Sequence, residues 1–137
     1  MALKIFYFDM MIENVDRSVL VGKPNLFTKG IDLWVLDHEK AFAFLTPFIG
    51  MSTSAPWVLD QHLAANHILY HKLKGKKLNF GELEGFLDVL NEGFWQKLKN
   101  LMPEDWILPE FDNIVEHIDA IRAHQAEFLV NIKSILS

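Results

Sequence analysis

Apolar residues recur along this chain at intervals of three and four, as they do on one face of an α-helix. The pattern predicts helices over four stretches: 56–73, 80–91, 93–102 and 111–136. The last stretch is long enough for one helix, or for two with a break near Ala123. Over residues 3–14 the apolar side chains occupy every face instead, which predicts a short helix that is buried on all sides.

The residues at the ends of these stretches agree with the predicted helices. Pro56 suits a first helical turn, because the N–H that proline lacks would have no partner there. Asn79 can cap a helix that begins at Phe80. Pro103 cannot continue a helix, so the one before it should stop there.

One segment has a different pattern, and it predicts a β-hairpin over about 25–37. Two short runs of strand-forming residues meet there at a turn containing Gly30. Just before the hairpin, Gly22 and Pro24 break regular structure. We therefore expect a single, mostly α-helical domain over residues 1–137 with one short β-hairpin.

The composition is that of an ordered protein of a reducing compartment. Half of the 137 residues are hydrophobic, and 11 Phe and 4 Trp supply large core side chains. The absence of Cys excludes a disulfide scaffold and a thiolate metal site, and favours the cytoplasm. Asp9 interrupts the apolar start before a secretory signal develops, and no apolar run reaches the length of a membrane span.

The charge of the chain argues against nucleic acid as a partner. A formal net charge of −5 is the opposite of the basic surface that binds phosphate backbones. The one basic run, 72–77, is typical of a helix C-terminus that ends in a glycine turn. We expect neither a nucleic-acid partner nor a membrane partner.

Three polar residues around the predicted hairpin follow the order of parts in a protein kinase site. Asp16 lies in a loop after the first helix, Asn25 opens the hairpin and Asp37 closes it. A carboxylate on a rigid loop can orient an acceptor hydroxyl in phosphoryl transfer, while hard oxygen ligands hold Mg²⁺. Because paired strands lie about 5 Å apart, Asn25 and Asp37 should meet at the base of the hairpin. Asp16 is thus the candidate catalytic residue, and Asn25 and Asp37 are candidate magnesium ligands.

Each of these residues also has a structural interpretation. Asp and Asn commonly cap turns and helices, so Asp16 could cap a turn, Asn25 could begin a strand and Asp37 could cap a helix that follows. The functional interpretation depends on the three occurring together.

The same segments resemble a known family. The sequences N-V-D-R at 14–17, P-N-L at 24–26 and L-W-V-L-D-H at 33–38 are similar to the catalytic and metal-binding loops of bacterial HipA-like kinases. They look like the compact subfamily with patterns of the form NxDR, NPNLL and LWLIDHG. They are also distantly similar to phosphatidylinositol kinases.

The resemblance implies the C-terminal lobe of a kinase that transfers the γ-phosphoryl group of ATP to a hydroxyl, at family level a protein Ser or Thr, with Mg²⁺ and ATP as cofactor and co-substrate. It implies Asp16 as the catalytic residue, Asn25 and Asp37 as metal ligands, and Phe42 packed behind the metal loop. Only 15 residues precede Asp16, too few for the Gly-rich loop and strand lysine that cover the phosphates. We therefore expect the nucleotide lobe to be missing and this chain alone to be inactive.

Two explanations of a missing lobe stay open. The chain is either a piece of a larger kinase or an independent protein that keeps the lobe as a non-catalytic, pseudokinase-like interaction module. Both lead us to expect a partner on an exposed apolar surface: the missing lobe, another protein or a second copy in a homo-oligomer. The apolar run 5–12 is the expected place for that surface.

Histidines offer a hypothesis of a different class, a metal-binding helical protein. His67 and His71 are four residues apart on the predicted 56–73 helix, and His62 lies a little over one turn before them. Residues at this spacing share a face and could hold zinc. Arg17, finally, has two expected roles: contact with phosphate, or a salt bridge to Asp9 or Glu13.

Overall fold

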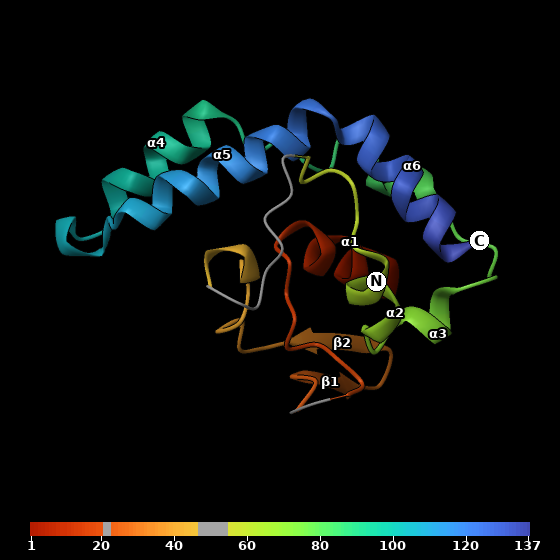
Figure 1. Cartoon of the computed structure of the whole chain (residues 1–137). Coiled ribbons are helices and arrows are strands. Elements are labelled where there is room, and N and C mark those ends of the chain that lie inside the picture. The colour runs from red at the N-terminus through yellow and green to blue at the C-terminus, as the bar shows by residue number, and fades with distance from the viewer. Residues whose placement is uncertain (21–22, 47–54) are drawn as a thin grey trace.

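The computed structural model describes residues 1–20, 23–46 and 55–137, which form six α-helices and one two-stranded sheet. In chain order the elements are α1 (Ala2–Met11), β1 (Leu26–Lys29), β2 (Asp32–Val35), α2 (Gln61–Asn66), α3 (Tyr70–Leu73), α4 (Glu92–Leu101), α5 (Pro109–Ala123) and α6 (Gln125–Leu136). Figure 1 shows α1 surrounded by the hairpin, α2, α3 and the two C-terminal helices. The mostly helical fold with a single hairpin in the described residues is as predicted.

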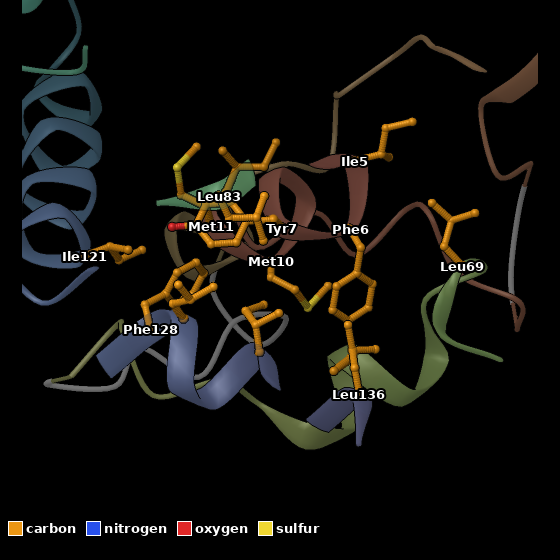
Figure 2. Close-up of a cluster of buried hydrophobic side chains, with 14 of the residues drawn as sticks. Ile5, Phe6, Tyr7, Met10, Met11, Leu69, Leu83, Ile121, Phe128 and Leu136 are labelled. Atoms are coloured by element: carbon orange, nitrogen blue, oxygen red, sulfur yellow. The ribbon is translucent and has the colours of Figure 1, made fainter. Parts of the chain in front are cut away.

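Helix α1 lies at the centre of the core. Its buried side chains meet those of α6, with Phe6 directed toward Leu136 and Tyr7 packed edge-on against Phe128, the ring centroids 5.0 Å apart (Figure 2). The prediction of a short helix buried on all sides is confirmed. The expected docking surface at 5–12 is wrong for the same reason, because the side chains of that run are buried in the core, in part against α6, more than 100 residues further along the chain.

The C-terminal apolar stretch forms two helices. Helix α5 ends at Ala123 and α6 begins at Gln125, with His124 out of helical geometry between them, so of the two alternatives the structure has two helices with a break near Ala123. Helix α4, capped by the Asn91 side chain, runs alongside α5 (Figure 1), and Trp95 of α4 meets Phe111 of α5 edge-on.

The predicted hairpin is confirmed. Strands β1 and β2 are antiparallel, with Phe27 opposite Trp34, and Gly30 makes the turn at φ +64°. The hairpin packs one face on the core through Leu26, Leu33 and Val35. Phe27 and Trp34 lie exposed on the other face. Gly22, which was predicted to break the chain before the hairpin, lies outside the described residues.

Two predicted helices form differently. The stretch 56–73 divides into α2 and α3, because His67 between them adopts an extended backbone with ψ 134°. The stretch 80–91 forms a short 3₁₀ turn and further turns, since Gly85 has φ +68°, a value outside right-handed helical geometry. Leu83 and Leu87 are buried nonetheless, so their spacing reports burial against the core and not a helix.

The burial of α6 residues predicts which substitutions in this helix lower stability. Ile132 is fully buried, while Val130 on the same helix is 62% exposed. We expect Ile132→Ala to lower the free energy of unfolding by about 2–5 kcal/mol, because it removes buried methylene groups and leaves a cavity. Val130→Ala is the matched control and should change it by less than about 0.5 kcal/mol. Urea denaturation measures both, and equal losses would contradict the placement of α6.

Candidate functional site

A buried ion pair joins α1 to the loop that follows it. The Nε of Arg17 donates to Oδ2 of Asp9 at 2.6 Å, and the side chains are 1% and 0% exposed. Asp9 also accepts hydrogen bonds from Asn14 Nδ2 and His67 Nε2, each at 3.0 Å. Of the two roles expected for Arg17, the structure contains the salt bridge to Asp9.

The hydrogen bonds fix the protonation of this cluster. The backbone N–H of Leu69 donates to His67 Nδ1 at 3.2 Å, so Nε2 is the ring nitrogen that donates to Asp9. Burial alone raises the pKa of Asp9, but the hydrogen bonds from His67, Arg17 and Asn14 and the charge of Arg17 together lower it. Asp9 is therefore an ionised carboxylate in the core.

The other edge of Arg17 holds the base of the hairpin. Its Nη1 donates to the carbonyl oxygens of Pro24 and Asn25 at 3.1 and 2.8 Å. Its Nη2 lies 3.0 Å from Nε2 of His38, which must accept that hydrogen bond because guanidinium only donates. Arg17, which directly follows Asp16, thus contacts both ends of the hairpin: Asn25 at its start and His38, the residue after Asp37, at its end.

The structure brings two of the predicted site residues into contact. Nδ2 of Asn25 donates to Oδ2 of Asp16 at 3.0 Å. Because the amide nitrogen must face that carboxylate, the amide oxygen of Asn25 is left for another partner. The other carboxylate oxygen of Asp16 receives the ammonium of Lys40 at 3.2 Å. Sequence reasoning missed Lys40, whose one signal is that it follows Asp37 by three residues in the predicted metal loop.

Asp37 lies beside this pair along the backbone. The N–H of Leu36 donates to the carbonyl oxygen of Asn25 at 3.0 Å at the base of the hairpin. Asp37 is the residue directly after Leu36, so its backbone lies next to this hydrogen bond. The Asp37 carboxylate is exposed and accepts from the N–H of Glu39 at 3.4 Å. Among the contacts of the described residues it bonds to neither Asp16 nor Asn25.

Backbone pairing ties the loop after α1 to the loop after β2. The N–H of Phe42 donates to the carbonyl oxygen of Ile12, and the N–H of Val15 donates to that of Lys40 at 3.4 Å. On the opposite side, Ile68 N–H donates to the carbonyl oxygen of Arg17 at 3.0 Å. The Asp16 loop is therefore clamped between two distant segments.

Backbone strain is concentrated in these loops. All four described non-glycine residues with positive φ lie here: Glu13 at 45°, Asn25 at 47°, Asp37 at 50° and Phe42 at 56°. Asn and Asp tolerate this region, whereas Glu and Phe rarely occupy it. Such conformations cost about 1–3 kcal/mol each and cluster at functional sites, where the surrounding structure imposes them.

Asn25 and Asp37 carry oxygen donors of the type that Mg²⁺ takes. Mg²⁺ takes one or two protein oxygen ligands and completes its shell with phosphate and water, and Asn25 and Asp37 can offer one oxygen each. Phe42, expected behind the metal loop, is half-buried against the core just after it.

The histidine hypothesis finds no support in the described residues. Nδ1 of His67 accepts from Leu69 and Nε2 bonds to Asp9, so both ring nitrogens are engaged. His71 belongs to α3, on the other side of the break in the predicted helix. The parts of the chain that the structure describes contain no group of three His, Cys, Asp or Glu side chains that could hold a metal ion.

Comparison with known proteins adds no relative: no family model, no curated protein and no solved structure matches this chain. Within residues 1–20, 23–46 and 55–137, no helix has the length and apolar character needed to cross a membrane.

Next to the Asp16 loop, Glu13 lines a cavity of about 390 Å³ together with Phe44, Glu116 and His117. Burial, and then the charge of Asp60, raise the pKa of Glu13 to about 7, although the backbone N–H of Phe44 bonds to it. Burial also lowers the pKa of His117, against the effect of its hydrogen bond to the Met11 carbonyl. Both groups favour their neutral forms in the folded protein.

Removing the buried charge of Asp9 tests its role. We expect Asp9→Asn to lower the free energy of unfolding by about 3–5 kcal/mol, because it leaves Arg17 as an uncompensated buried cation. The matched control is Asp112→Asn, which breaks an exposed pair with Lys99 and should cost at most about 1 kcal/mol. Chemical denaturation of both variants gives the comparison, and a small loss for Asp9→Asn would contradict the network.

The raised pKa of Glu13 predicts a pH dependence. The carboxyl ionises in the unfolded chain near its ordinary value of 4.5 but in the folded protein only at about 7. Its contribution to stability is therefore complete below pH 4.5 and is lost as the pH rises through 7. We expect Glu13→Gln to match the wild type near pH 4 and to exceed its free energy of unfolding at pH 8 by about 1–2 kcal/mol, a value reduced for partial solvent exposure. A difference that does not change with pH would argue against the raised pKa.

Proposed function

We propose that residues 12–43 form half of a phosphoryl-transfer site of the kind found in the C-terminal lobe of a HipA-like kinase. In this site Asp16 orients an acceptor hydroxyl, and Asn25 and Asp37 hold magnesium bound to ATP. The observation that carries the proposal is the contact between the Asn25 amide and the Asp16 carboxylate at the base of the hairpin.

The surroundings of Asp16 suit an acceptor-orienting carboxylate. The side chain is largely buried, and it is held by Asn25 on one oxygen and Lys40 on the other. A hydroxyl that enters beside it can direct its proton at a carboxylate of fixed orientation, which lowers the entropy lost on reaching the reactive geometry. A protein Ser or Thr is the acceptor that the family resemblance implies.

Lys40 places a positive charge beside Asp16, where the transferred phosphoryl group would lie. Its ammonium reaches Asp16, yet half of the side chain is exposed, so it can turn toward an incoming phosphate. An ammonium there would balance charge on the transferred group, as cationic side chains do in phosphoryl transfer. Magnesium, when bound by Asn25 and Asp37, would neutralise the phosphate oxygens that face the site.

The site as described is half of what the chemistry requires. In kinases a Gly-rich loop and a strand lysine cover the nucleotide phosphates, and residues 12–43 supply neither. We therefore expect the chain to bind Mg²⁺–ATP weakly and to turn it over only when a nucleotide-covering lobe is supplied.

A non-catalytic interaction module is the second candidate, favoured by the exposed face of the hairpin. Phe27 and Trp34 face solvent there at 56% and 57% exposure, with Ile31 at the turn and Leu36 beyond it. A contiguous exposed apolar patch marks a place where another polypeptide binds. Either a nucleotide lobe or an unrelated partner would fit this face, next to the proposed site.

Calorimetric titration of ATP with Mg²⁺ tests the proposal. We expect saturable binding that requires Mg²⁺ and that Asp37→Ala weakens at least about tenfold, or 1.4 kcal/mol. Asp32→Ala is the matched control, because Asp32 is an exposed carboxylate at the other end of β2, and it should change the affinity less than about twofold. Equal affinity in the two variants would contradict the metal role of Asp37. Absence of binding at millimolar ATP would favour the interaction module.

A further inference from the structure

A second exposed apolar surface lies at residues 101–110, which span the end of α4, the connection and the start of α5, and which we term the helical tip. Leu101, Trp106 and Leu108 are 75%, 67% and 57% exposed there. Single exposed apolar residues are ordinary, but three large ones within eight positions give this short segment apolar surface for a partner to cover. Figure 1 shows the helical tip at the far end of the paired α4 and α5, away from the rest of the molecule.

The helical tip is also acidic. Glu104, Asp105 and Glu110 are exposed, and none of them takes part in an ion pair among the described residues. The nearby Asp112 differs, since Lys99 neutralises it at 2.8 Å. A partner for the helical tip should therefore combine apolar surface with positive charge.

The opposite charge is gathered on one turn of this same chain, 72–77, which we term the lysine turn. It carries four exposed lysines: Lys72, Lys74, Lys76 and Lys77. These are four of the chain's 13 basic residues, in a protein of net charge −5, and no carboxylate of the described residues pairs with them. The N–H of Gly75 donates to the carbonyl oxygen of Leu136 at 2.8 Å, which fixes the turn against the end of α6.

The two surfaces cannot meet within one molecule. In Figure 1 the helical tip lies at one end, and α3, which leads into the lysine turn, lies at the other end beside the C-terminus. Their charges are therefore available to a second copy of the chain.

We propose that the helical tip of one copy docks on the lysine turn of another. The carboxylates of the helical tip face the lysine ammonium groups, which favours encounter and orientation. Trp106 can lie against a lysine through a cation–π contact, while the aliphatic lysine stems cover the leucines. A contact between two helical tips is disfavoured, because it would bring three carboxylates of each copy together. This proposal is independent of the phosphoryl-transfer site.

The geometry sets the kind of assembly. Each contact uses the helical tip of one copy and the lysine turn of the next, and leaves one of each free. Association should therefore increase with concentration, and further copies can add head to tail unless the second pair of surfaces also meets. Because the charges are exposed, salt should weaken it.

Sedimentation velocity on the whole chain tests the proposal, from micromolar to near-millimolar protein. At low salt we expect the average sedimentation coefficient to rise with concentration, and at about 500 mM salt, where the Debye length is only about 4 Å, to fall toward that of a monomer. E104K/E110K and K76E/K77E should each weaken association at least about tenfold, and W106S should weaken it without a charge change. K23E/K29E, a double charge reversal on the hairpin side of the molecule, is the matched control and should associate like the wild type.

A mixture of the two charge-reversed chains tests most specifically whether the helical tip docks on the lysine turn. The unmodified helical tip of K76E/K77E can dock on the unmodified lysine turn of E104K/E110K. We therefore expect an equimolar mixture to form 1:1 complexes, although each chain alone is monomeric. Circular dichroism confirms that each variant is folded. A wild-type monomer at the highest concentration, association that both reversals leave unchanged, or a mixture that stays monomeric would each overturn the proposal, and the surfaces would then belong to partners other than a second copy.

Discussion

The contact between Asp9 and Arg17 is the interaction on which the rest of this structure depends. Both side chains are withdrawn from water, at a desolvation cost that an ion pair offsets only if its remaining polar atoms are also bonded. Here they are: Asn14 and His67 complete the carboxylate, and the hairpin carbonyls and His38 complete the guanidinium. No buried side-chain nitrogen or oxygen of the described residues is left without a partner. The pair is therefore a fixed point inside an otherwise apolar core.

Arg17 connects this buried ion pair to the candidate site. It follows Asp16 directly, so its burial sets the direction of the Asp16 loop, and its outer edge holds both ends of the hairpin. The contact between Asp16 and Asn25 is a consequence of that arrangement. Glu13 and Phe42 have positive φ angles, which are strained for these residue types. The contacts between the loop after α1 and the loop after β2 hold them in this conformation.

The sequence was informative where a residue's surroundings are local. The hairpin, the break near Ala123 and the Arg17–Asp9 pair depend on spacing or on partners nine residues apart or fewer, and the structure contains all three. The first helix was predicted to be buried because its own apolar residues occupy every face. The prediction of one helix over 56–73 was wrong because His67 has an extended backbone and bonds to Asp9, which is 58 residues away in the sequence. Lys40 was missed because Asp16 is 24 residues distant. The docking surface at 5–12 was wrong because apolar composition does not distinguish a surface that binds a partner from one that α6 covers.

The same limit applies to the site. Residue types and order predicted that Asp16, Asn25 and Asp37 belong together, and the fold places the first two in contact and the third beside them on the backbone. Their chemical roles come from the family resemblance and stay a prediction, and the Asp37 carboxylate also closes its own turn by accepting from the N–H of Glu39.

The most direct measurement of the central claim is paramagnetic broadening of backbone amide signals by Mn²⁺, a magnesium substitute, in the presence of ATP. We expect the signals of residues near Asn25 and Asp37 to broaden first, together with those of Asp16 and Lys40, and Mg²⁺ in excess to reverse the effect. Broadening that is uniform over the chain, or that is centred on the acidic helical tip, would contradict a metal–nucleotide half-site at the base of the hairpin.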